Sequence, residues 1–383
     1  MERLSSLNNP NLVDQFSKYE KIISPTIDGA ITEEIFLPGG DPNATDQLLE
    51  LLWRKRQRSL LMIGLQILST RRALAQASGF EAALEIFKFL PQPHRRRFLE
   101  YPPMRIWLSQ MLYQELTDNK IKSPKETILL SRLNAFHRLI EDVTRNKLAY
   151  LQDGHFLIQR FDVDPILAEI APPSYVFERL DERISNDRNN PYTITFFRSV
   201  VDAALGRICD ALPEMAVLFP KFVKTIIHLP DIEFRSCSAQ RYAGAIMLSA
   251  GDESLLAVEE SLVHEYGHQI LYCVMESDPL IRSNSNDTFV LPWSGSERDA
   301  YGYFHATYIY LLLALYFEQA LKCERTDLEA VEKRLGEVLE GLERAIPDFE
   351  RANFFTRIGF AFYRKMASVT SDVLIRNRGQ LKH

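Results

Sequence analysis

Apolar side chains recur at helical spacing along most of this 383-residue chain. Leucines and isoleucines three and four residues apart, set around a charged face, predict a helix over 46–68. Residues 1–45 instead carry turn signals such as Pro38-Gly39-Gly40, and no regular element is expected there. The helical pattern predicts further helices near 80–90, 104–117, 124–150, 164–170, 192–211, 299–321, 327–345 and 350–375.

Three short segments depart from this pattern and predict a small β-sheet. Residues 223–228 alternate in character and are rich in β-branched side chains, and residues 232–236 and 244–249 are similar. Residues 251–254 then offer a turn and a helix cap, so a helix is expected over 254–275. The chain is therefore predicted to be mainly α with a small β-sheet, in the α+β class.

Two breaks indicate a boundary within the chain. The run 171–174 contains two prolines, and the run 185–191 is polar and ends on a proline. We predict a helical N-terminal region over 1–190 and a second region over 191–383, with one continuous domain as the alternative.

The helix expected over 254–275 carries the motif His264-Glu265-Tyr266-Gly267-His268. Residues four apart lie on one helix face, so His264 and His268 are placed to bind one metal ion. In metallopeptidases with this HExxH pattern, the glutamate acts as general base toward a metal-bound water, and Glu265 occupies that position. The sequence thus predicts a metallopeptidase-like core of a strand and an HExxH helix, and makes 191–383 the metal-binding catalytic region. The alternative is two core histidines whose nitrogens are satisfied by hydrogen bonds.

Two histidines need a third protein ligand to hold a catalytic ion. The longer peptidase motif HExxHxxGxxH would supply it, but Leu271 and Val274 stand at its glycine and last histidine. The remaining candidates are downstream carboxylates such as Glu297, and His305. A histidine in an apolar helix is usually a core residue, but because the motif lacks its third ligand we assign His305 to the metal.

The segment after the motif resembles a known family. Residues 291–293 read Leu-Pro-Trp, and residues 298–305 read Arg-Asp-Ala-Tyr-Gly-Tyr-Phe-His. This order, after a strand and an HExxH helix, resembles the HExxH-type peptide β-hydroxylases, which depend on iron and 2-oxoglutarate and modify ribosomally made peptides. Positions that differ from the family's pattern are Ser294, Asp299 and Ala306.

The resemblance covers about residues 244–310 and implies chemistry and partners. It implies Fe(II) as the metal, 2-oxoglutarate as the co-substrate, and a precursor peptide in RiPP biosynthesis as the substrate. The far carboxylate of 2-oxoglutarate needs a cation. If a helix begins near Arg298, this residue lies two turns before His305 on the same face, roughly 10 Å along the axis. A flexible arginine reaches that far, so we expect Arg298 to bind the co-substrate, with pairing to Glu297 or Asp299 as the alternative.

The composition of the chain bears on which partners it binds and where in the cell it is expected. A formal net charge of −6 argues against nucleic acid as a partner. The four cysteines lack paired spacing, which suits a reducing compartment, and the N-terminus has no apolar signal segment, so we expect a cytoplasmic protein. The apolar stretch 300–317 approaches membrane-spanning length, but tyrosines are spread through it, so we expect a buried core helix and no membrane.

Three functions stay open at this point. The first is an Fe(II)/2-oxoglutarate-dependent oxygenase that hydroxylates the β-carbon of a side chain in a peptide. The second is a zinc metallopeptidase with Glu265 as general base. The third is a non-catalytic protein that binds a metal or a peptide. Three histidines suit zinc as well as iron, whose common site is two histidines and a carboxylate, so the sequence leaves the metal open.

Overall fold

The computed structural model describes residues 42–117, 126–144, 157–160, 191–228, 235–240, 243–249, 254–282, 287–350 and 353–377. In these ranges the protein is mainly helical, as predicted, and it has two small β-sheets where one was predicted. The helices are α2 (Pro42–Thr70), α3 (Arg72–Ala77), α4 (Phe80–Phe89), α5 (Gln92–Glu100), α6 (Pro102–Thr117), α7 (Glu126–Thr144), α10 (Pro191–Ala211), α11 (Met215–Phe222), α12 (Leu255–Ser277), α13 (Ala300–Ala320), α14 (Leu328–Glu350) and α15 (Arg357–Arg376). The strands are β1 (Leu157–Arg160), β2 (Thr225–His228), β3 (Ser236–Cys237), β4 (Ala245–Leu248), β5 (Thr288–Val290) and β6 (Glu297–Asp299).

The larger sheet has the strand order β1-β2-β4-β3. β2 runs parallel to both β1 and β4, whereas the short β3 pairs antiparallel with the end of β4, with Ser236 opposite Leu248. β5 and β6 form a separate antiparallel pair in which Phe289 lies opposite Arg298.

Each face of the larger sheet belongs to a different hydrophobic core. All four residues of β2 and all four of β4 are buried. Alternate strand residues point to opposite faces, and those of β2 and β4 divide accordingly: Ile226, Ile246 and Leu248 enter the core of α10 to α15, and Ile227, Ala245 and Met247 enter the core of the N-terminal helices. The sheet therefore forms the wall between the two cores.

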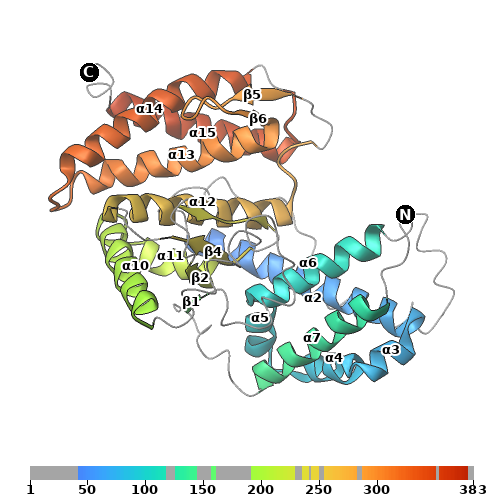
Figure 1. Ribbon diagram of the computed structural model, residues 1–383. Coiled ribbons are helices and arrows are strands. Elements are labelled where there is room, and N and C mark those ends of the chain that lie inside the picture. The colour runs from blue at the N-terminus through green and yellow to red at the C-terminus, as the bar shows by residue number, and fades with distance from the viewer. Residues whose placement is uncertain are drawn as a thin grey trace.

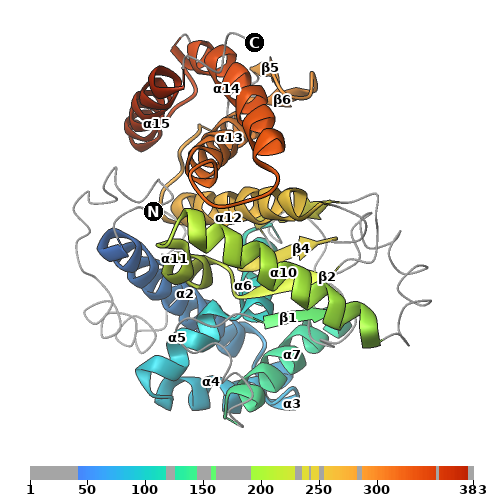
Figure 2. The same cartoon turned by 90° about the vertical axis from the view of Figure 1, so that its left-hand side faces the viewer.

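Helix α13 lies at the centre of the C-terminal half. It contacts α10, α12, α14 and α15, and most of its side chains are buried. In Figure 1, α13, α14 and α15 form a layer over α12, and α12 covers the larger sheet. Figure 2 shows α10 in front of that sheet. The buried core helix predicted over 300–317 is thus confirmed, and no helix in the described ranges combines the length and apolar character needed to cross a membrane.

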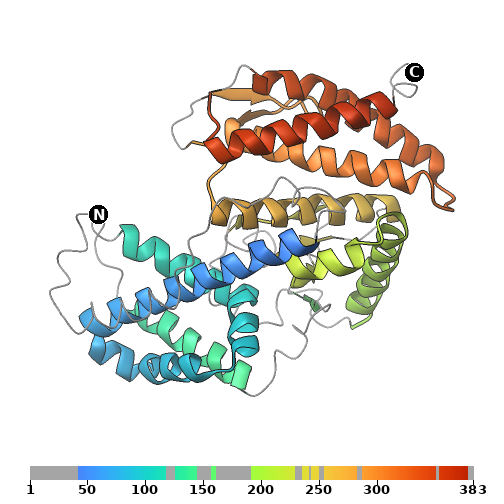
Figure 3. The ribbon, with the colours of Figure 1, turned by 180° about the vertical axis from the view of Figure 1, so that it is seen from behind.

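Helix α2 runs from the N-terminal helices to the helices of the C-terminal half (Figure 3), and it contributes to both hydrophobic cores. Leu48 and Leu52 near its start pack in the same core as α12, whereas Leu60 and Ile63 pack in the core of the N-terminal helices. The boundary predicted at residue 190 is not tested by this arrangement and stays a prediction.

Most predicted elements are confirmed to within a few residues, including the motif helix and the strands within 223–228 and 244–249. The helix predicted near 164–170 and most of the strand predicted over 232–236 lie outside the described residues. The sequence pattern gave no indication of α3, α5, α11, β1, β5 or β6, which are too short to show a clear period.

A partly buried ion cluster joins α2 and α6 to α12. Arg56 Nε and Nη2 donate to the two carboxylate oxygens of Glu276, each at 2.7 Å, and Arg105 Nη2 donates to the same carboxylate at 3.2 Å. The arginine side chains are only 6% and 8% exposed. Burial alone raises the pKa of Glu276, but the two arginines outweigh it and lower the pKa to about 2.

Glu276→Gln is expected to lower the free energy of unfolding at pH 7 by about 3–5 kcal/mol, because two buried guanidinium groups lose their counter-charge. The folded-state pKa of Glu276 is depressed below the ordinary 4.5. Its contribution is therefore complete above about pH 4.5 and is lost as the pH falls toward 2. Urea unfolding at pH 7, 4 and 2.5 should show the wild type and the variant converging at low pH.

The matched control is Glu340→Gln. Glu340 lies 3.8 Å from Arg344 in an exposed pair on α14, and such pairs are worth about 0–1 kcal/mol. A stability gap for Glu276→Gln that is the same at all three pH values, or no larger than that of the control, would contradict the proposed role of the cluster.

Candidate metal centre

Helix α12 begins with a side-chain cap and carries the motif in its middle. Ser254 is extended, and its hydroxyl accepts a hydrogen bond from the Ala257 N–H at 3.3 Å. The helix runs for 23 residues, most of them buried. His264 and His268 therefore lie one turn apart on one face, as predicted.

The neighbouring face of the motif is attached to the sheet. Both carboxylate oxygens of Glu265 accept hydrogen bonds from serine hydroxyls, Ser236 at 2.7 Å and Ser238 at 2.5 Å. One turn later, the Gln269 side chain bonds a backbone N–H at 2.6 Å and a backbone C=O at 3.0 Å at the start of β4. Glu265 and Gln269 are four residues apart, so together they fix the rotation of α12 about its axis. The adjacent stripe thereby carries His268 toward α13.

Gly267 permits α13 to approach this stripe closely. A Cβ at Gly267 would lie 2.6 Å from Ile309 Cδ1 and 2.8 Å from Leu312 Cδ1. Tyr266 points elsewhere and stacks on Phe219 with ring centres 5.7 Å apart. The small residue inside the motif thus leaves room for these two side chains of α13 beside the histidines.

The three predicted histidines form a row. The ring centres of His264 and His268 are 4.9 Å apart, and those of His268 and His305 are 5.5 Å apart. The Nδ1 atoms of His268 and His305 face each other at 3.3 Å. Two nitrogens that bind one ion at about 2.0–2.1 Å lie roughly 3.0–3.4 Å apart, for octahedral to tetrahedral geometry. The contact is a hydrogen bond between the two rings, as expected for core histidines, and its length also falls within the nitrogen spacing of two ligands of one ion.

Burial keeps these rings in the form that binds metals. It lowers the pKa of His305 to about 3. Burial, and then the neighbouring His264 and His305, hold the pKa of His268 well below its usual range. Both imidazoles are therefore neutral at pH 7, which metal binding requires. In addition, His305 Nε2 is buried and has no hydrogen-bond partner in the described ranges, a situation that costs about 1–3 kcal/mol.

Two tyrosines border the row of histidines. The ring centre of Tyr272 lies 5.8 Å from those of both His268 and His305, and its hydroxyl donates to the Ser238 carbonyl at 3.4 Å. Tyr301 lies 4.2 Å from His305 between ring centres. Sequence reasoning gave neither tyrosine a role, although Tyr272 continues the four-residue spacing of the two motif histidines.

The donors fit a metal only in part. Within the described ranges, no three His, Cys, Asp or Glu side chains are grouped so that they would hold an ion together. The Nδ1 atoms of His268 and His305 have the spacing of two ligands, whereas the unsatisfied Nε2 is the nitrogen on the other side of the His305 ring and cannot bind the same ion. Glu297, the alternative ligand, is exposed in β6, where its carboxylate accepts from the Thr288 hydroxyl at 2.7 Å.

Arg298 lies outside the helix that carries His305. It is exposed in β6, and α13 begins only at Ala300, capped by Asp299, whose carboxylate accepts from the Gly302 N–H at 2.7 Å. The expected two-turn spacing on one helix face therefore does not apply. Arg298 Nη1 donates to the Glu297 carbonyl at 3.2 Å. Its binding of 2-oxoglutarate stays a prediction.

Comparison of the chain with models of known protein families finds no match, and a search of curated proteins finds no similar sequence. The function has to be inferred from the site itself.

Gly267→Ala is expected to destabilise the protein by about 1–3 kcal/mol, because the added methyl group pushes Ile309 and Leu312 away. The same displacement should move His305 from His268 and weaken the binding of Zn²⁺ or Co²⁺. Chemical unfolding and metal titration measure the two effects.

The matched control is Gly336→Ala, in α14. A Cβ at Gly336 meets nothing within 4 Å, so this substitution should leave metal affinity unchanged and be neutral or mildly stabilising. Equal metal affinities for the two variants would show that the close approach at Gly267 does not set the histidine spacing.

Proposed function

We propose that this protein is an Fe(II)/2-oxoglutarate-dependent oxygenase that hydroxylates the β-carbon of a side chain in a ribosomally made peptide. The observation that carries the proposal is the approach of His305 to His268, with Nδ1 atoms 3.3 Å apart across two helices. It supports the third ligand that the family resemblance implies. As part of the proposal, the core in which β4 is followed by α12 is taken to be metallopeptidase-like, and the cytoplasm is the expected location.

His264, His268 and His305 would hold the iron. When bound, iron and 2-oxoglutarate supply the oxidising power: O₂ and 2-oxoglutarate are consumed, succinate and CO₂ are released, and one C–H bond of the peptide becomes C–OH. The protein keeps the imidazoles neutral by burial and fixes their separation through the packing of α12 on α13. Tyr272 packs against His268 and His305, and Tyr301 packs against His305.

The zinc metallopeptidase is the second candidate, and the surroundings of Glu265 count against it. A general base must accept a proton from a water next to the metal. Glu265 is only 2% exposed, and Ser236 and Ser238 occupy its two oxygens. These contacts favour a role in which Glu265 holds α12 on the sheet. A protein that binds a metal or a peptide without catalysis is the third possibility.

Anaerobically purified protein given Fe(II), 2-oxoglutarate and then O₂ is expected to form succinate, at a low rate when no peptide is present. His305→Ala should abolish this activity and weaken Fe(II) binding. The control is His137→Ala, since His137 lies on α7 and contacts the Gly79 carbonyl; it should retain both. If the protein forms no succinate, binds zinc tightly and cleaves peptides, the result would support the peptidase and contradict the oxygenase.

The Glu265→Gln substitution distinguishes the oxygenase hypothesis from the peptidase hypothesis directly. A glutamine can still accept a hydrogen bond from one serine, so we expect succinate formation to persist at a rate within about tenfold of the wild type. The lost charge-assisted bond should lower stability by about 1–3 kcal/mol. The double variant Ser236→Ala/Ser238→Ala should lower it similarly, and combining it with Glu265→Gln should add little. If the wild type cleaves peptides and Glu265→Gln loses this cleavage completely at normal stability, Glu265 would be favoured as the general base.

A further inference from the structure

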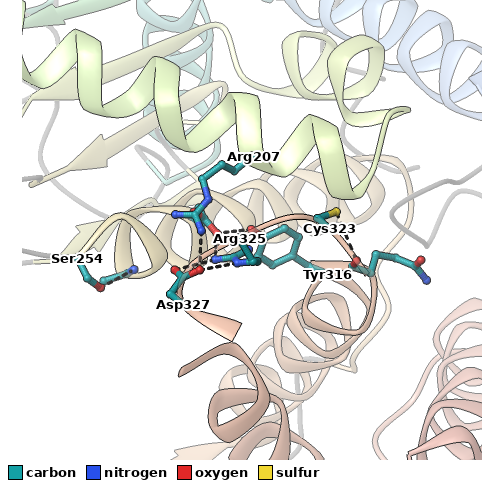
Figure 4. Close-up of polar contacts among 9 residues, drawn as sticks. Arg207, Ser254, Tyr316, Cys323, Arg325 and Asp327 are labelled. Carbon is teal, nitrogen blue, oxygen red and sulfur yellow. Dashed lines mark hydrogen bonds and ion pairs between the residues drawn. The ribbon is translucent and has the colours of Figure 1, made fainter. Parts of the chain in front are cut away.

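The two helices that carry the histidines are fixed against each other at two levels. Side chains of α13 pack closely at the glycine of the motif. Nearer the start of α12, the buried Glu259 accepts hydrogen bonds from the Tyr316 hydroxyl of α13 and from Arg325 beyond the end of that helix, the latter at 3.0 Å (Figure 4). Because the backbones are held, the freedom left to His268 and His305 is the rotation of their side chains, whose terminal torsion has broad preferences.

The orientation of an imidazole ring decides whether its nitrogen can bind a metal ion. In most metal sites the second ring nitrogen donates to a carboxylate, a backbone carbonyl or a water, and this bond holds the ring. Within the described ranges, the one hydrogen bond that His268 and His305 form joins their Nδ1 atoms, and the Nε2 atom of His305 is buried without a partner. This hydrogen bond and an ion bound by both Nδ1 atoms exclude each other, so the rings need a support that does not use their nitrogens.

Tyr272 supplies such a support through its ring. The centre of this ring lies 5.8 Å from the ring centres of both His268 and His305, which belong to different helices. The planes of Tyr272 and His268 are within 15° of parallel, and those of Tyr272 and His305 are tilted by 38°. At centre distances of about 4.5–7 Å, aromatic rings prefer defined mutual orientations. A turn of either imidazole therefore disturbs its packing on Tyr272.

The ring of Tyr272 is itself anchored at both ends. Tyr272 follows His268 by four residues on α12, so it lies one turn further along the same face, and it is only 7% exposed. At its other end, the hydroxyl donates a long hydrogen bond to the Ser238 carbonyl, and the Ser238 hydroxyl donates to Glu265. The tyrosine is thus held by the helix and by the segment after β3.

Tyr301 is less suited to this role. Its ring packs on His305 with ring centres 4.2 Å apart, and no ring contact joins it to His268 within the described part of the chain. It is also 37% exposed. A partly exposed ring on one histidine does not fix the orientation of two.

We infer that Tyr272 is a positioning residue, whose ring holds the imidazoles of His268 and His305 in the orientation in which their Nδ1 atoms face each other. It takes the place of the hydrogen bonds that orient histidines in other metal sites. The inference rests on the proposed function, because it assigns Tyr272 its role at the metal centre.

The first test is titration of the full chain with Co²⁺, followed by calorimetry and by the visible absorption of the bound ion. Tyr272→Leu should weaken Co²⁺ binding by about 10- to 100-fold, the usual effect of losing a group that orients metal ligands, and should change the visible spectrum. Tyr272→Phe keeps the ring and should restore most of the affinity. Tyr272→Met, which also lacks a ring, replaces the leucine variant if that variant does not fold.

The matched control is Tyr363→Leu. Tyr363 is 6% exposed, and its ring stacks on Phe355 in the core of α10 to α15, with ring centres 5.3 Å apart. The control should lower the temperature of thermal unfolding by an amount similar to that of Tyr272→Leu and leave Co²⁺ binding unchanged.

The second test uses metal-free protein with isotope-labelled histidine. The ring N–H between the two Nδ1 atoms should give a proton resonance, which is assigned by its absence in His305→Ala. This resonance should be lost or broadened in Tyr272→Leu and retained in Tyr272→Phe and Tyr363→Leu, because it requires both rings to keep their orientation.

The outcomes separate this inference from the proposed function. Tyr272→Leu that keeps the N–H resonance, or that binds Co²⁺ with wild-type affinity, overturns the inference, and succinate formation would then leave the oxygenase standing. An equal loss of Co²⁺ affinity in Tyr363→Leu overturns it too, because the effect would be one of general destabilisation. Wild-type protein that binds no Co²⁺ overturns both. Co²⁺ binding that depends on the ring of Tyr272, in a protein that forms no succinate, supports the inference and rejects the oxygenase.

Discussion

The rotation of α12 about its own axis is the constraint on which the rest of the site depends. Successive residues of a helix point about 100° apart, so a small turn would carry the histidine face away from α13. The buried side chains of Glu265 and Gln269 prevent this by bonding β3, the residues after it, and the start of β4. The approach of α13 at Gly267 follows from that fixed orientation.

The acidic residues of α12 each specify a different neighbour. Glu259, Glu260 and Glu265 are buried, and Glu276 is partly buried. Removing a carboxylate from water costs free energy unless it is paired, so the position of each partner is constrained. The four pairings are Glu259 with Arg207 and Arg325, Glu260 with Arg334, Glu265 with Ser236 and Ser238, and Glu276 with Arg56 and Arg105. In this way one helix sets the places of α10, α14, β3, α2 and α6.

The sequence predicted what depends on neighbouring residues, and missed what depends on distant ones. The cap at Ser254, the motif helix and the alternating strands are local patterns, and the structure contains them. His305 lies 37 residues after His268, and it was assigned to the metal because the motif lacks a third ligand, an assignment that the family resemblance also implies. The serines that bind Glu265, 27 and 29 residues before it, have no local signature in this role. The expected reach of Arg298 assumed a helix that begins near it, but the helix begins at Ala300 with Asp299 as its cap.

The core beneath the histidines draws on almost the whole length of the described chain, from Ala44 in α2 to Val373 in α15. A ribosome releases the N-terminal end first, and domains generally fold as units once their segments are available. Here the first and last helices belong to one unit. The nascent polypeptide therefore has to wait for α15 before this core can close, with the apolar surfaces of α12 and α13 exposed in the interval. Protection of those surfaces during translation is a requirement that the connectivity imposes on the cell.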